Sequence, residues 1–393
     1  MRVVIIILSV LLSYVLSAGA VMDAESLRQA KDLASSEGKP ILLEFMREDC
    51  KHCAKARREA HEVPEVSQAL DRAVHYMINV LEGEGGELKQ RYDIGDTYPV
   101  FVLTDSEGDV ISRWTGYSGS ADFVRRFNSA MNDLTTVRQR IEAFEASPSY
   151  SQAIFLARYF TDTGDHPQAV KYFREAQKLN PASSGRHRFD IFMNSANAVW
   201  KEQWDFAYVY PPADSIMLAE QINLREVLRV ATLISRLTRK FDRTDSLAKY
   251  IDLALKLSAG QTDARTVESR TLLLAEKALQ LEGDTARALS LKKSTLGSNW
   301  GRNPKVMYEY AKWCLERKVN LREAEEITQK VVDFTPEGEL RARVYNVLAD
   351  ILMERGRLKE AAQAVVTAIE NHPENPFYVE KLEELQAELD QQK

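Results

Sequence analysis

The chain has very little cysteine: three residues in a total of 393. A disulfide-stapled scaffold of this size would need many more, so packed apolar cores must hold the fold together. A dominant charge is also missing, because 52 lysines and arginines stand against 58 aspartates and glutamates, giving a net charge of −6 without a long block of either sign. We therefore exclude a disulfide-rich scaffold and expect no nucleic acid among the partners.

Long apolar runs are scarce as well. The exception is the 14-residue stretch Val3 to Leu16, which follows Arg2 and precedes small residues at 17–20. This arrangement predicts a signal peptide over residues 1–20 and hence an exported protein, periplasmic or otherwise extracytoplasmic. The run is shorter than the roughly 20 residues that cross a bilayer comfortably. An uncleaved anchor is the alternative, and only then would the chain be bound to a membrane.

The remaining chain has two parts with different periodicities. Residues 21–133 predict an α/β domain with a central mixed sheet flanked by helices. Its expected order is helix, strand, helix, strand, helix, strand, strand, helix, with helices at 23–36, 50–60, 87–92 and 120–131 and strands at 41–46, 74–80, 99–104 and 110–114. Residues 134–149 predict a connecting helix and a linker, and residues 150–393 predict an all-helical domain.

The helical part repeats itself. Three stretches end in Pro181, Pro336 and Pro373, and small or apolar residues recur at fixed distances before each proline. The matching triplets are Ala169, Ala324 and Ala361; Ala176, Val331 and Ala368; and Phe160, Leu315 and Leu352. Small residues let two antiparallel helices approach closely, and the proline ends the second helix.

This pattern resembles the tetratricopeptide repeat, with units at about 150–183, 305–338 and 342–375. Lys312 departs from it, and weaker copies are expected over 269–301 and around Ala248. Residues 184–228 match poorly, and we expect Tyr210-Pro211-Pro212 to interrupt any helix there. A generic helical bundle is the alternative to repeats. The resemblance implies a solenoid that binds a protein or peptide ligand.

The cysteine pair Cys50-Lys51-His52-Cys53 follows a predicted buried strand and opens a predicted helix. Unpaired amides at a helix start favour the thiolate of Cys50, and Cys53 is spaced to resolve a mixed disulfide. Half a zinc site and an inert structural bridge are the alternatives. Zinc needs four ligands, and no second Cys-x-x-Cys pair occurs in the sequence. A structural Cys50–Cys53 bridge would close a loop too short to stabilise the fold much. We therefore expect no metal and no cofactor.

Four segments around the pair carry a family resemblance. They are Ile41-Leu42-Leu43-Glu44-Phe45, Cys50-x-x-Cys53, Thr97-Tyr98-Pro99-Val100-Phe101 and Gly116-Tyr117. Over roughly residues 23–133 the sequence resembles the thioredoxin family, most closely the extracytoplasmic thioredoxin-like domains of bacterial thiol-disulfide interchange proteins.

The resemblance implies roles for particular residues. Cys50 and Cys53 would be the catalytic pair, and Glu44 would be the buried acid that handles the proton of Cys53. Pro99 would be the family's cis-proline, whose loop, with Tyr98, docks an extended substrate beside Lys51 and His52. Without the resemblance, Glu44 could equally be a surface charge and Pro99 an ordinary proline at a strand start.

Two departures leave the redox direction open. Asp49, preceded by Glu48, stands just before Cys50, where an aromatic residue is common in the family, and the charges of both acids oppose a thiolate at Cys50. Lys51 and His52 favour the thiolate. The third cysteine, Cys314, lies in a predicted repeat helix, where we expect it to be a packed residue.

The sequence thus predicts an extracytoplasmic thiol-disulfide oxidoreductase that acts on protein partners through a Cys-x-x-Cys pair, with helical repeats that bind those partners. The alternative is a redox-inactive scaffold or assembly factor in which the repeats mediate protein interaction.

Overall fold

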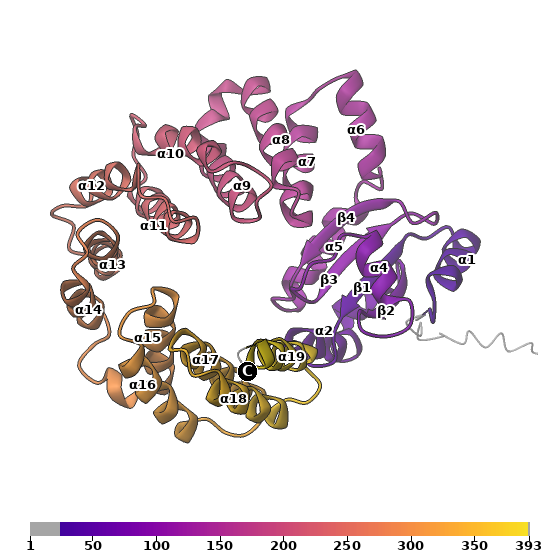
Figure 1. The fold of residues 1–393 in the computed structure, drawn as a ribbon. Helices are drawn as coiled ribbons and strands as arrows, with labels where there is room; N and C mark the ends of the chain where they lie inside the picture. The colour runs from indigo at the N-terminus through magenta and orange to yellow at the C-terminus, as the bar shows by residue number, and fades with distance from the viewer. Residues whose placement is uncertain (1–23, 392–393) are drawn as a thin grey trace, which may run out of the picture. The chain divides into compact units, whose positions relative to one another are not determined.

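The computed structural model describes residues 24–391 (Figure 1). The predicted signal peptide lies outside the described residues. The chain divides into two compact units between Pro212 and Ala213. The first unit holds the predicted α/β domain, the predicted connecting helix and the first helical hairpin. No helix within 24–391 combines the length and apolar character that a membrane span requires.

A four-stranded mixed sheet is the centre of the first unit. Its strands are β1 Ile41–Met46, β2 Val74–Asn79, β3 Val100–Thr104 and β4 Val110–Thr115. The order is β2-β1-β3-β4, with β1 and β2 parallel and the other two pairs antiparallel. The predicted mixed sheet is therefore confirmed, and β4 lies at one of its edges.

Helices cover both faces of this sheet. They are α1 Leu27–Glu37, α2 Lys51–Glu62, α3 Pro64–Leu70, α4 Gly85–Arg91 and α5 Ser120–Met131. The predicted order is confirmed except that α3 was not expected. This helix has seven residues, too few to show a helical period, and Pro64 begins it directly after α2 because proline is well tolerated in a first turn.

The start of α4 also differs from the prediction, which began this helix at residue 87. The helix begins at Gly85, in close contact with the end of β2. A Cβ atom at this position would lie 1.9 Å from the carbonyl oxygen of Asn79. Only glycine allows the chain to turn into a helix so near the strand.

Each face of the sheet has its own apolar core. Ile41, Leu43 and Phe45 of β1 pack on one face with residues of α1 and α4. Leu42 packs on the other face with residues of α2, α3 and α5. Because side chains alternate along a strand, Glu44 falls on the Leu42 face.

The rest of the first unit is helical. It contains α6 Val137–Ala146, α7 Tyr150–Thr163, α8 His166–Leu179, α9 Arg188–Trp200 and the start of α10 Tyr210–Met217, with 3-10 turns at Pro181–His187 and Phe206–Val209. The expectation that Pro211 and Pro212 interrupt a helix is wrong. Both lie in the first turn of α10, where a missing N–H costs little, so they open a helix instead.

The second unit is a series of antiparallel helical hairpins. Its helices are α11 Leu224–Lys240, α12 Leu247–Leu257, α13 Ala264–Gln280, α14 Thr285–Ser294, α15 Pro304–Glu316, α16 Leu321–Phe334, α17 Glu339–Glu354, α18 Leu358–Asn371 and α19 Pro376–Gln391. The hairpins α15/α16 and α17/α18 coincide with two predicted repeats. Ala324 and Ala361, the small residues of the pattern, are fully buried, which permits the close helix approach.

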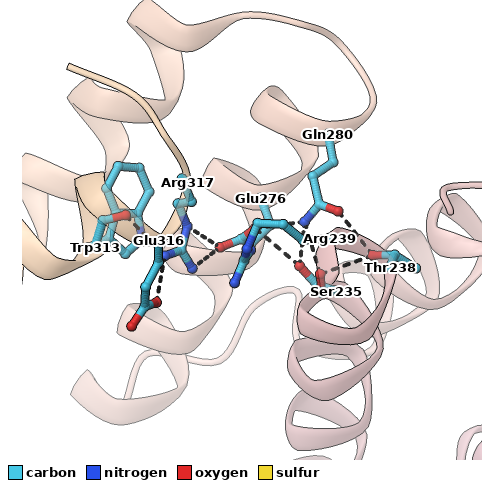
Figure 2. A network of polar contacts seen from close by, with 8 residues as sticks. All are labelled: Ser235, Thr238, Arg239, Glu276, Gln280, Trp313, Glu316 and Arg317. Carbon is cyan, nitrogen blue, oxygen red and sulfur yellow. Dashed lines mark hydrogen bonds and ion pairs between the residues drawn. The ribbon is translucent and has the colours of Figure 1, made fainter. Parts of the chain in front are cut away.

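A buried polar network joins three helices of the second unit (Figure 2). Glu276 of α13 is only 6% exposed, and its carboxylate accepts hydrogen bonds from Arg239 of α11 at 2.9 Å and from Nε of Arg317, just after α15, at 2.7 Å. Ser235 and Gln280 donate to the same carboxylate. Burial alone would raise the pKa of Glu276, but the charges of Arg317 and Arg239 outweigh it and lower the pKa below its usual range.

Candidate functional site

Cys50 and Cys53 form a disulfide at the start of α2. Cys50 is the N-cap residue, and its Sγ accepts the N–H of Cys53 at 3.1 Å. A helix start directs unpaired amides and a partial positive charge at this sulfur, which would favour its thiolate after reduction. Cys53 is only 2% exposed whereas Cys50 is half-buried. A partner can therefore reach the outer sulfur far more easily than the inner one.

The Tyr98–Pro99 peptide bond is cis, as predicted. The carbonyl oxygen of Tyr98 lies 3.6 Å from Sγ of Cys50, so the chain brings this loop against the cysteine pair. The N–H of Gly116 donates to the carbonyl of Pro99 at 2.8 Å and ties the loop to the end of β4. Of the residues predicted to dock substrate, Tyr98 and Pro99 are thus in place beside Cys50, and their docking role stays a prediction.

Glu44 is buried, with 4% of its surface exposed, so the alternative of a surface charge is wrong. Its Oε2 lies 2.9 Å from Nε2 of His75, which is 2% exposed. His75 lies on β2 in register with Leu42, and this pairing puts the histidine on the same face of the sheet as Glu44. The two side chains form a buried acid–imidazole pair.

This pair lies on the side of the sheet that α2 covers. Cys53, Ala56 and Ala60 are the buried residues of α2, spaced as one helical stripe that faces the sheet. Ala56 and Ala60 belong to the apolar core on the Glu44 face. The carboxylate of Glu44 and the buried sulfur of Cys53 therefore share one side of the sheet, as the family role for Glu44 requires.

Sequence reasoning missed His75. Its position in the predicted strand 74–80 was visible, but its burial against Glu44 depends on the parallel register of β1 and β2. The available signal was a histidine within an apolar strand. His75 pairs with Leu42, two positions along β1 from Glu44, so the two polar side chains are diagonal neighbours on one face.

Arg47 was missed too, and it changes the charge balance at the site. Its guanidinium donates from Nε and Nη2 to the two carboxylate oxygens of Asp49, each at 2.9 Å. Such a bidentate ion pair compensates the charge of Asp49. The predicted opposition of Asp49 to a Cys50 thiolate is therefore weaker than the sequence suggested.

The far end of α2 is fixed by a polar contact with the segment before α5. Glu59 Oε2 accepts from the hydroxyl of Tyr117 at 2.8 Å and from the N–H of Ser120 at 3.1 Å. Burial and the bond to Glu59 raise the pKa of Tyr117. These contacts hold the helix that carries both cysteines in a fixed orientation.

Lys51 and His52 lie beside the cysteine pair, whereas the third cysteine, Cys314, lies in the helical part of the chain. Lys51 and His52 are exposed in the first turn of α2, where a docked partner could contact them. Cys314 is buried in α15, where burial raises its pKa to about 11, so its thiol stays protonated and unreactive near neutrality. Among residues 24–391, no three His, Cys, Asp or Glu side chains gather in a group that could hold a metal ion.

Comparison with known families agrees with this geometry. Residues 27–130 match the thioredoxin-like domain family, and residues 154–183 match the tetratricopeptide repeat family. The chain thus carries a region similar to thioredoxin-like domains, followed by one region similar to a tetratricopeptide repeat at the α7/α8 hairpin. No curated protein matches the sequence. A thioredoxin-like domain with a cysteine pair, joined to repeats of this kind, supports a role in thiol redox chemistry or in protein interaction.

Proposed function

We propose that this protein is an extracytoplasmic thiol-disulfide oxidoreductase that acts on protein partners through Cys50 and Cys53. The observation that carries the proposal is the position of the half-buried Cys50 at the start of α2, where it is bonded to the buried Cys53 and lies beside the carbonyl of Tyr98. The apolar run before residue 17 supports export, and a disulfide persists more readily outside the cytoplasm.

The reaction exchanges one disulfide for another. With the pair reduced, the Cys50 thiolate attacks a partner disulfide, forms a mixed disulfide and releases one partner thiolate. The Cys53 thiolate then attacks Sγ of Cys50, closes the Cys50–Cys53 disulfide and releases the second partner thiolate. The partner gains two electrons and the pair loses two; run backwards, the same steps oxidise a partner dithiol.

Glu44 assists the second step by accepting the proton of Cys53. A thiol is a poor nucleophile until it loses its proton, and the buried sulfur has little contact with water. The hydrogen bond to His75 holds the carboxylate of Glu44 on the α2 side of the sheet. The imidazole of His75 is also a polar partner for Glu44 once the carboxylate has accepted the proton. The helical hairpins bring partners near the pair, which raises their effective concentration.

The test compares purified wild type with Cys50→Ala for reduction of insulin by dithiothreitol and for oxidation of a reduced dithiol peptide. We expect wild type to accelerate at least one reaction and Cys50→Ala to leave both at the uncatalysed rate. Wild type that does not exceed Cys50→Ala in either assay would contradict the proposal. The protein would then be a redox-inactive scaffold that acts through its repeats.

The role of Glu44 predicts a kinetic defect without loss of the fold. Glu44→Gln keeps the size and a hydrogen bond to His75 but cannot accept a proton. We therefore expect the exchange rate near neutral pH to fall about a hundredfold, the low end of general acid–base effects. Glu62→Gln, which removes an exposed acid at the end of α2 far from Cys50, is the matched control. Stopped-flow exchange measured across pH checks this; equal rates for the two variants would contradict the role.

A further inference from the structure

An arginine-lined cavity lies in the first unit, away from the cysteine pair. It is formed by β4, α5, α6 and α7 and has a volume of about 810 Å³. Four successive residues of β4, Ile111 to Trp114, line it. Successive side chains of a strand point to opposite faces, so a cavity that touches all four must follow the open edge of the sheet.

The cavity is rich in positive charge although the chain as a whole is acidic. Five arginines line it against two aspartates, Asp133 and Asp162. The arginines are Arg113, Arg125, Arg126, Arg140 and Arg158. Arg125 and Arg126 share the single carboxylate of Asp122, and Arg140 pairs with Asp133 at 2.9 Å. Arg158 is exposed and makes no ion pair with any residue in the described range.

Arg113 is the most unusual member of this group. It is only 9% exposed, and its guanidinium donates to the backbone carbonyls of Tyr92 and Asp93 at 2.8 and 3.1 Å. Its Nε finds no hydrogen-bond partner in the described part of the chain. The charges of Asp162 and Asp93 act on it without a direct ion pair, and they do not outweigh burial, which lowers the pKa of Arg113. A buried cation without a paired anion is costly, so this position favours an anion supplied from outside.

A second buried donor lines the same cavity. Trp114 is 4% exposed, and its indole N–H has no acceptor within the described residues. Buried donors of this kind nearly always find a partner in folded proteins. Because successive side chains of a strand alternate, Arg113 and Trp114 leave one unpaired N–H group on each face of β4, and a ligand that follows the strand edge could reach either of them.

We propose that this cavity binds a peptide segment that carries carboxylate side chains. Carboxylates match both the arginine excess and the buried donors, and guanidinium groups bind them in a bidentate manner. A lone oxyanion would fill little of a cavity whose size is typical of sites for much larger ligands. Ile111, Ile154 and Phe155 also line it, and these apolar side chains fit a peptide better than a free anion.

The probe is a fluorescein-labelled peptide in which glutamate and valine alternate, titrated with the full chain and followed by anisotropy. Its control is the same peptide with glutamine for glutamate. We expect the glutamate peptide to bind, the glutamine peptide not to bind, and affinity to fall as salt is added. Equal binding of both peptides would overturn the proposal, as would free succinate binding as tightly as the glutamate peptide, because the site would then take a small dicarboxylate.

Variants locate the binding. Arg158→Glu reverses an exposed charge at the cavity without touching a core, and we expect it to weaken the glutamate peptide about fivefold or more. Arg28→Glu, the same change on the exposed side of α1, is the matched control and should bind as wild type does. Arg113→Met should abolish binding of the glutamate peptide, and circular dichroism should show that this variant is still folded. Indistinguishable affinities for Arg158→Glu and Arg28→Glu would rule out this cavity.

Discussion

Cys53→Ala should turn the protein into a trap that stays covalently joined to its partners. Cys50 keeps its position at the start of α2 and can still attack a partner disulfide, but the buried sulfur that resolves the mixed disulfide is gone. The variant does not alter the loop that presents the carbonyl of Tyr98 beside Cys50. We therefore expect mixed disulfides to accumulate where wild type shows almost none.

The measurement is non-reducing electrophoresis of an affinity-tagged Cys53→Ala protein from cells, followed by mass spectrometry of the joined chains. Bands that vanish with reductant and are missing from Cys50→Ala/Cys53→Ala are the expected result. Cys314→Ala/Cys53→Ala is the matched control and should trap fully, because Cys314 is buried and its thiol stays protonated. Bands that persist without Cys50, or depend on Cys314, would contradict the mechanism.

The order of elements around the cysteine pair was predictable because each leaves a local signal. Apolar runs of strand length, turn residues and a proline before Val100 fix β1, β2 and β3 to within a residue or two. α3 left no such signal because it is short and follows α2 without a loop. Whether Pro211 breaks or opens a helix was also undecidable locally, since the answer depends on where the preceding turn ends.

The chemistry of the site was predictable only in part. Alternation along β1 shows that Glu44 faces away from Leu43 and Phe45, but it does not say whether that face is covered. Helices α2, α3 and α5 cover the face on which Glu44 lies. The hydrogen-bond partner of Glu44 is His75, on a strand that pairs with β1 only in the folded chain. Long-range register, and not local pattern, decides such contacts.

Charge effects at Cys50 show the same limit on a smaller scale. From the sequence, Glu48 and Asp49 oppose the Cys50 thiolate while Lys51 and His52 favour it, and the net effect on the thiolate could not be decided. The structure pairs Asp49 with Arg47, so a charge counted against the thiolate is largely compensated. Two residues of separation were enough to hide the pairing, because i and i+2 contacts depend on the local turn and not on a regular period.

Glu276→Gln should destabilise the second unit by about 3 kcal/mol or more, as expected when one partner of a buried ion pair is removed. The neutral amide keeps the size of the side chain but leaves Arg317, whose side chain is only 9% exposed, without its main counter-charge. Arg239 of α11 loses the same anion, so the contacts that join α11, α13 and the end of α15 weaken (Figure 2). Urea unfolding followed by circular dichroism measures the loss, and hydrogen exchange of α13 and α15 localises it.

Glu316→Gln is the matched control because it acts on the same arginine. Glu316 lies 3.2 Å from Arg317, but its side chain is 48% exposed, so its removal should cost less than about 1 kcal/mol. Equal losses for Glu276→Gln and Glu316→Gln would contradict the importance of burial.

The dependence of this stability on pH has a definite sign. The folded pKa of Glu276 lies below its unfolded value of about 4.3, so the ionised carboxylate stabilises the fold above that pH. The contribution is lost as the pH falls through the folded pKa. The difference in unfolding free energy between wild type and Glu276→Gln should therefore be largest near neutrality and shrink only below the ordinary glutamate range. A difference that stays constant into strong acid would show that the glutamine disturbs packing and not charge.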